Sequence, residues 1–286
     1  MSRVAEQLVT GSAPVRRRPK ATLLIGIVLT GLIALMALVS LFWLPYPLAD
    51  TSGGRLEGPS ALHLLGTDRL GRDLLSQLMW GARIALVVGT CAVAIAAVLG
   101  TIVGLLAAFA RPWVDDTLSA GLDVVIAFPV LLLAMLVVAV QGASLWSAVL
   151  AIGLAMSAVV ARLTRILARR VLQEQFITAA RTSGTGVLGV VFQHVLPNIA
   201  PTLAVSLALQ FGAAVLAEAS LSYLGLGAPP PNASWGRMLQ EAQGTVLTAP
   251  VGAIAPGVAI IALVLGVNFL ADGLRDLADP TRRRSR

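Results

Sequence analysis

Residues 84–110 read IALVVGTCAVAIAAVLGTIVGLLAAFA and contain no charged side chain. A helix needs about 20 apolar residues to cross the roughly 30 Å of hydrocarbon in a bilayer, and this stretch is longer than that. A spanning segment must satisfy its backbone hydrogen bonds internally, and the stretch lacks the alternation of apolar and polar residues that marks a membrane β-strand. It therefore predicts a transmembrane helix.

Five further apolar segments have the same character. They lie at residues 21–44, 118–140, 145–161, 199–219 and 251–271. The composition agrees, because 57% of the residues are hydrophobic and 12% are charged, against about 25% charged in ordinary soluble domains. A soluble fold with so few charges would leave large apolar patches facing water. We therefore expect an all-α, polytopic membrane protein with six transmembrane helices. The first segment is too long for the core of a signal peptide and is expected to be retained.

The basic residues predict the orientation of these spans. The net charge is +7, and basic residues gather at both termini and in alternate loops. With the N-terminus in the cytoplasm, sixteen of the 21 basic residues lie inside, and only Arg55, Arg69, Arg72, Arg83 and Arg237 lie outside. Cytoplasmic loops are enriched in Lys and Arg, so both termini are predicted to be cytoplasmic. A nucleic-acid partner is not expected, because it would need a basic face on a soluble module.

The predicted topology divides the chain into five parts. They are a basic cytoplasmic tail at 1–20, a first transmembrane helix at 21–44, an external loop with an interfacial helix at 45–83, a five-helix core at 84–271 that includes a cytoplasmic loop at 163–198, and a basic cytoplasmic tail at 272–286. No soluble domain is expected between these parts.

The cytoplasmic loop contains SGTGVLG at residues 183–189, a literal G-x-G-x-x-G. A dinucleotide site would need a strand before this motif, a helix after it and an acidic residue about 20 positions further on. Here the preceding residues are helical in character and no acidic residue follows at that distance. Apolar side chains instead recur at helical spacing, at Phe176, Ala180, Val187, Val191 and Val195. The loop therefore predicts two amphipathic helices joined by a bend at 183–186, with Pro197 opening the next span.

Such an elbow could merely anchor the loop at the membrane surface. However, Ala179-Ala180-Arg181-x-x-Gly184, followed by Leu196-Pro197, resembles the EAA loop of ABC importer permeases. In that family the loop is a coupling helix that docks into a cleft of the cytoplasmic ATPase. Thr178 stands where the family usually has glutamate, so an ion pair from that position is not carried over. The resemblance implies an ATPase-coupling role for Thr178, Ala179, Ala180, Arg181, Gly184, Leu196 and Pro197.

Three further segments resemble the dipeptide/oligopeptide/nickel (DppC/OppC-like) subfamily of these permeases. They are HLLGTDRLGRDLLSQLMWGAR at 63–83, DVVIAFP at 123–129 and AEASLSYLGLGAPPPNASWGRML at 217–239. The resemblance implies a MetI-like bundle in the bacterial plasma (inner) membrane that translocates dipeptides or oligopeptides. It also implies a second, homologous B-type permease, two ABC ATPase subunits or domains that hold ATP and Mg, and an external solute-binding protein. No cofactor, metal site or catalytic residue is expected in this chain. A nickel or other small-solute importer is the alternative, and a self-sufficient secondary transporter is a more distant one.

Polar side chains inside the predicted spans are functional candidates, because they are costly there. Glu218 could lie at the translocation gate and meet a peptide ammonium group, or it could pair with Arg237 or cap the loop helix that follows. Gln210 and Asn268 could line the pathway or hydrogen-bond between helices. Asp123 lies near the inner end of the third span and close to Arg111 in topology, and it is expected to form a structural ion pair or to act as a helix N-terminal charge rather than to contact substrate.

Two surface patterns complete the set of candidates. Gly100, Gly104 and Ala108 form a face of small residues, which is expected to pack within the chain rather than in a dimer. On the outer side, two alternatives stay open for a cluster of alternating charge: a self-paired interfacial helix or a contact for the solute-binding protein. This cluster comprises Asp68, Arg69, Arg72 and Asp73.

Overall fold

The computed structural model describes residues 19–278, and every regular element in that range is helical. The elements are α1 (Pro19–Phe42), α2 (Leu74–Phe109), α3 (Pro112–Ala127), α4 (Val130–Gln141), α5 (Leu145–Leu172), α6 (Gln175–Thr182), α7 (Val187–Gly189), the π-helix η1 (Val190–Val195), α8 (Leu196–Tyr223), α9 (Trp235–Ala242), the 3₁₀-helix η2 (Gln243–Thr245) and α10 (Val251–Ala278). The predicted all-α class is confirmed. The predicted tails at 1–20 and 272–286 lie partly outside the described residues.

Within that range, five helices are long and apolar enough to span a membrane: α1, α2, α5, the continuous stretch Val187–Tyr223, and α10. The third predicted span, at 118–140, is not one straight helix, since α3 and α4 meet at a bend of 90° and count as a sixth span only when taken together. Phe128 is extended at this break, with φ −84° and ψ 135°, and Pro129 follows it. A proline disfavours helical geometry in the residue before it and cannot donate a backbone hydrogen bond, which accounts for the break.

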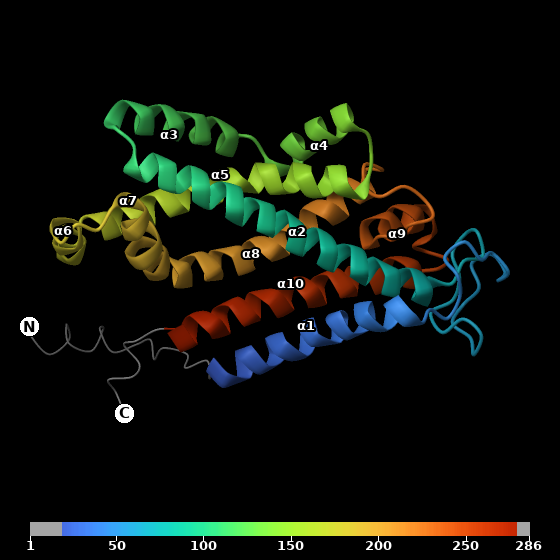
Figure 1. Ribbon diagram of the computed structural model, residues 1–286. Helices are drawn as coiled ribbons and strands as arrows, with labels where there is room; N and C mark the ends of the chain where they lie inside the picture. The colour runs from blue at the N-terminus through green and yellow to red at the C-terminus, as the bar shows by residue number, and fades with distance from the viewer. Residues whose placement is uncertain (1–18, 279–286) are drawn as a thin grey trace, which may run out of the picture.

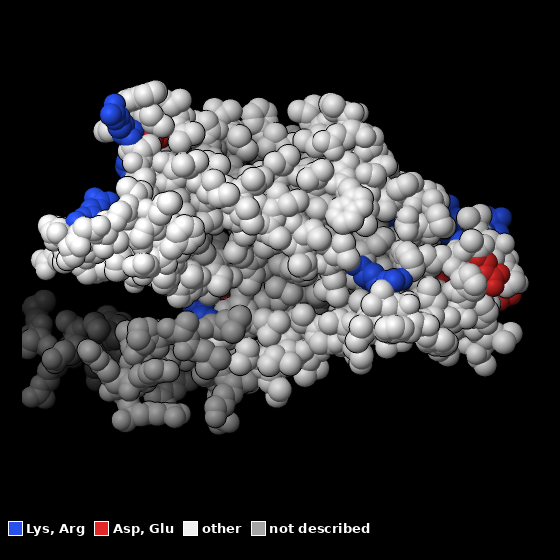
Figure 2. All heavy atoms as spheres, in the orientation of Figure 1, with Lys and Arg blue, Asp and Glu red and all other residues white. Residues whose placement is uncertain are grey.

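The long helices run side by side along the molecule (Figure 1). The start of α1, the end of α10, α6 and α7 lie at one end, and α9 and the loop at 43–73 lie at the other. A six-span chain with both termini on one side requires this grouping. On the face shown in Figure 2, acidic atoms gather mostly at the loop end and the middle is nearly free of charge, as expected for a surface in hydrocarbon. Which end faces the cytoplasm stays a prediction.

The helices extend beyond the predicted spans, and this corrects two predicted boundaries. Residues 43–73 contain no helix, and residues 74–83, predicted as the end of the external loop, form the first turns of α2. The helix begins there because the Asp73 side chain caps it and accepts a 2.7 Å hydrogen bond from the Ser76 amide. At the other end of the chain, α10 continues to Ala278, so residues 272–278 belong to a helix rather than to a tail.

The face of small residues on α2 packs against α5, which confirms the intrachain alternative. A methyl group added at Gly100 would lie 2.7 Å from the Ser157 carbonyl oxygen, and one at Gly104 would collide with the Ala161 carbonyl oxygen. Because the glycines of α2 have no side chain, the backbone and the side chains of Val160 and Thr164 on α5 approach α2 closely, which gives extensive van der Waals contact.

We expect Gly104→Ala to lower the stability of the purified protein by about 1 kcal/mol, because the added carbon forces α2 and α5 apart. Thermal unfolding in detergent measures the change. Gly121→Ala is the matched control, since Gly121 is also inside a helix but has no atom within 4 Å of an added carbon. Equal stability of the two variants would contradict the packing argument.

Candidate functional site

The predicted elbow is present as α6 followed by a tight turn. The helix is capped at its C-terminus by Ser183, and Gly184 has φ +89°, a backbone conformation that residues other than glycine rarely adopt. The Ser183 amide donates to the Ala179 carbonyl and the Thr185 amide to the Ala180 carbonyl, both at 3.0 Å. These bonds satisfy carbonyls that the end of the helix leaves free. The glycine in this motif therefore shapes a helix end, as the sequence predicted.

One face of α6 is anchored and the other is free. Ile177 is 1% exposed and packs in a cluster with Val190, Val195 and Ile199. The predicted coupling residues Thr178, Ala179, Arg181 and Gly184 are exposed, and Ala180 is partly buried. The structure thus brings these five residues together on one projecting surface. Leu196 and Pro197 are not on that surface.

The second helix of the predicted pair is not a separate element. α7, η1 and α8 follow one another without a break, so the stretch Val187–Tyr223 forms one continuous helical segment of 37 residues. Pro197 does not open this segment as predicted but lies within it, at the second residue of α8. In Figure 1 the segment changes direction between α7 and α8, and α8 then runs toward the end of the bundle that carries α9.

A buried carboxylate near this end was missed by the sequence analysis. Asp115, in the first turn of α3, has a side chain that is 2% exposed. Arg165 Nε and Nη2 donate to its two oxygens at 2.5 and 2.7 Å, and Arg169 Nη2 lies 2.6 Å from the second oxygen. Two arginines on successive turns of α5 thus clamp the start of α3. The i, i+4 spacing of the arginines was visible in the sequence, but their partner lies 50 residues away.

Asp123 forms an ion pair, as the sequence predicted, and its partner lies on α5. Its carboxylate lies 3.2 Å from Arg162 Nη1, and both side chains are more than half exposed. Arg162 stands one turn before Arg165, so α5 supplies the partners for Asp115 and Asp123, two of the three acidic side chains of α3. An exposed pair of this kind contributes little to stability.

Glu218 is buried against the outer loop and does not pair with Arg237. It is 2% exposed, and the Ser222 hydroxyl donates to it at 2.6 Å. The Ser234 hydroxyl is a second hydrogen-bond partner. Arg237 instead donates to Glu241 at 3.0 Å. The carboxyl group therefore ties α8 to the N-terminus of α9, which agrees with a structural role.

We expect Glu218→Gln to keep near-normal uptake, because an amide oxygen can still accept the Ser222 hydrogen bond. Glu218→Ala removes that acceptor and should lower stability by about 1 kcal/mol. Uptake in membrane vesicles and unfolding in detergent check the two variants. A large loss of uptake in a stable Glu218→Gln protein would favour the gate role over the structural one.

Gln210 and Asn268 are not brought together by a hydrogen bond. Both side-chain polar atoms of Gln210 are buried and have no hydrogen-bond partner among the described residues. Asn268 Oδ1 lies near Gly212, two residues after Gln210 on α8. An unpaired buried amide in a membrane helix is costly, so Gln210 is a functional candidate that the described residues leave without a partner.

The outer charged cluster is built into the loop rather than free in solvent. Asp68 accepts from Arg72 Nε at 2.6 Å and from Gln77 Nε2 at 3.0 Å, and Arg72 Nη2 donates to Glu241 at 2.6 Å. Asp73 caps α2 and contacts His63 Nδ1 at 3.0 Å. The self-pairing alternative is present as the Asp68–Arg72 ion pair, but the helix expected with it is absent, since these residues lie in an irregular segment that is bonded to α9 through Glu241.

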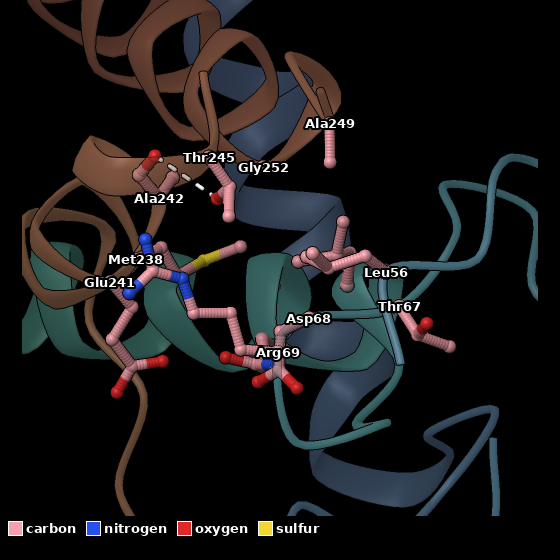
Figure 3. Close-up of a pocket in the computed structure, with 12 residues that line it drawn as sticks. Leu56, Thr67, Asp68, Arg69, Met238, Glu241, Ala242, Thr245, Ala249 and Gly252 are labelled. Atoms are coloured by element: carbon pink, nitrogen blue, oxygen red, sulfur yellow. Dashed lines mark hydrogen bonds between the residues drawn. The ribbon is translucent and has the colours of Figure 1, made fainter. Parts of the chain in front are cut away.

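A small cavity of about 30 Å³ separates this segment from α9 and the start of α10 (Figure 3). Leu56, Asp68, Arg69, Met238 and Glu241 are among the residues that line it. Of the four predicted binding-protein contacts, only Arg69 is exposed; Arg72 is partly buried and the two aspartates are buried. The surface available to an external partner is therefore narrower than the sequence suggested.

Comparisons with known proteins agree with this architecture. A family model described as "Binding-protein-dependent transport system inner membrane component" matches residues 100–284. The chain is 38% identical to the dipeptide transport system permease protein DppC of Alkalihalophilus pseudofirmus, with 90% of this chain and 85% of that protein covered. It is 39% identical to the glutathione transport system permease protein GsiD of Pectobacterium atrosepticum, over 88% of this chain and 86% of that protein. It is also 41% identical to the di/tripeptide transport system permease protein DppC of Pseudomonas aeruginosa, over 79% and 74%.

Among solved structures, a chain of the MetNI methionine ABC transporter in an inward-facing conformation is similar in fold. The TM-score is 0.60 and the identity 20%, and the match covers 71% of this chain and 97% of that chain. At that identity the likeness concerns the fold alone. It agrees with the predicted MetI-like bundle.

Proposed function

Since this chain belongs to the family of binding-protein-dependent transport system inner membrane components, the permease subunits of ABC importers, we propose that it imports short peptides. Membership makes it a multi-pass protein of the bacterial inner membrane and a transport subunit rather than an enzyme. The names of its relatives support the substrate class. Two are permeases for dipeptides or tripeptides, and the third serves glutathione, which is itself a tripeptide.

An importer permease of this family works with a second permease, with ATPases and with a binding protein. We infer more specifically that the second permease is a homologous B-type subunit and that two ATPase subunits or domains hold ATP and Mg. The solute-binding protein would dock outside, where Arg69 is the exposed member of the charged cluster. In this topology both termini and α6 face the cytoplasm, which the grouping of these elements at one end supports (Figure 1).

The projecting elbow carries the proposed mechanism. Its exposed face, from Thr178 to Gly184, would dock into the ATPase, while Ile177 on its other face is packed against the helical segment Val187–Tyr223. When the ATPases bind ATP and close, they would displace this segment and switch the permease pair between inward-open and outward-open states. Each ligand must prefer one of the two states for this coupling to operate.

The decisive experiment is mass spectrometry of the molecules that co-purify with the partner binding protein, with metal analysis of the same sample. A series of short peptides would support peptide import. Stoichiometric nickel without peptide would overturn it and favour the metal branch of the subfamily. Purification of this chain with its associated proteins tests the rest, since an importer permease should bring ATPase subunits with it and a secondary transporter should not.

A further inference from the structure

α5, α8 and α10 enclose an open cleft near the end of the bundle that carries α6. Its volume is about 440 Å³, which is within the size range of small-molecule sites. The lining residues are Leu163 from α5, Pro201, Thr202, Val205, Ser206 and Leu209 from α8, and Arg275 from α10.

Among the described residues, the polar side chains of this cleft have no partners within the chain. Arg275 is the one charged lining residue, and it forms no ion pair with any side chain that the structure describes. By contrast, three of the four arginines of α5 are paired with aspartates of α3. The Thr202 and Ser206 hydroxyls likewise have no hydrogen-bond partner among the described residues, whereas Ser220 on the same helix donates to the Leu216 carbonyl at 2.8 Å.

A free guanidinium beside two free hydroxyls is suited to an anion with several acceptor oxygens. The planar fork of arginine matches a carboxylate, to which it can donate two parallel hydrogen bonds. The remaining lining is apolar and can accept side chains of different shape. A permease that handles peptides of varied sequence can rely only on groups that all peptides share, and the C-terminal carboxylate is one of them.

We propose that this cleft is a subsite for the C-terminal carboxylate of the peptide as it leaves the pathway, and that Arg275 binds that carboxylate. Thr202 and Ser206 are its additional hydrogen-bond donors. The inference rests on the function proposed above and adds the group that is recognised. Arg275 is exposed, so the attraction is modest, as a transport site that must also release its substrate requires.

Binding of Ala–Ala and of its C-terminal amide to the complete transporter tests the proposal. The complex is placed in nanodiscs without binding protein, and each peptide competes with a fluorescent Ala–Ala derivative that keeps its carboxylate. Wild type should prefer the acid to the amide by about fivefold to tenfold. Arg275→Gln should remove that preference, because it should weaken the binding of the acid and leave the binding of the amide unchanged. Arg111→Gln, which removes another exposed arginine near this end that has no ion pair, should keep it. No preference in wild type, or a preference that survives Arg275→Gln, would overturn the subsite.

The phosphate of an anionic lipid headgroup offers the same chemistry, so the binding is measured with and without phosphatidylglycerol. The preference for the acid should be present in both membranes. If Arg275→Gln changes only the phosphatidylglycerol that co-purifies, the cleft holds lipid and the proposal fails. ATP-driven uptake of Ala–Ala with the binding protein separates the two proposals. If wild type takes up Ala–Ala but its binding does not depend on Arg275, only the subsite proposal is overturned. If wild type shows neither uptake nor binding, both proposals are overturned.

Discussion

Replacing Gly184 by aspartate should reduce uptake by at least about tenfold while the chain still inserts into the membrane. The position has φ +89°, so a side chain costs about 1–2 kcal/mol of backbone strain or shifts the end of α6. Nothing lies within 4 Å of the added carbon, so folding of the bundle has no reason to fail. The change should act on the shape and charge of the surface that meets the ATPase. Uptake in vesicles, the amount of protein in the membrane and the amount of co-purified ATPase measure the three effects.

Gly186→Asp is the matched control. It adds the same charge two residues further on, also where no atom lies within 4 Å, but its backbone is extended with φ −68° and it precedes a helix. Aspartate is favoured at such an N-cap, so this variant should retain most of its uptake. Normal uptake by Gly184→Asp would show that the surface formed by α6 and Gly184 is not required for coupling to the ATPase. An equal loss in both variants would attribute the effect to charge instead of backbone shape.

The sequence predicted the helical class and the elbow because both depend on short-range information. A run of apolar residues identifies the part of a helix that lies in hydrocarbon, but it does not show where the helix ends. α5 continues through Arg162, Arg165 and Arg169 to Leu172, although hydropathy ends the span at 161. In the same way, residues 118–140 were predicted to form one span, whereas Phe128 and Pro129 separate two helices that meet at 90°.

The partners of the polar groups could not be predicted, since they are distant in the sequence. Arg72 pairs with Glu241, which lies 169 residues away on α9. This ion pair fixes the loop at 43–73 to α9, a contact that the sequence did not predict. Glu218 was given the nearest available cation, Arg237, but the fold presents serine hydroxyls to it instead. The sequence pattern therefore indicates which polar groups need partners, but the partners depend on the tertiary packing.

Asp115→Ala should lower the stability of the protein by about 2–3 kcal/mol and should also reduce uptake. The carboxylate is the shared partner of Arg165 and Arg169, and it holds the first turn of α3 on α5. Removal of one member of a buried pair usually costs about 3–5 kcal/mol. The expected cost is smaller here because the arginine side chains are 21% and 42% exposed, so water can replace part of the lost interaction.

Asp123→Ala is the control on the same pair of helices. Its ion pair with Arg162 is more than half exposed on both sides, so its loss should cost less than about 0.5 kcal/mol. Thermal unfolding in detergent and uptake in vesicles give the two readouts. If the clamp acts as a unit, Asp115→Ala combined with Arg165→Ala should cost less than the sum of the single changes. Additive effects, or equal losses from Asp115→Ala and Asp123→Ala, would show that the buried cluster does not hold α3 in place.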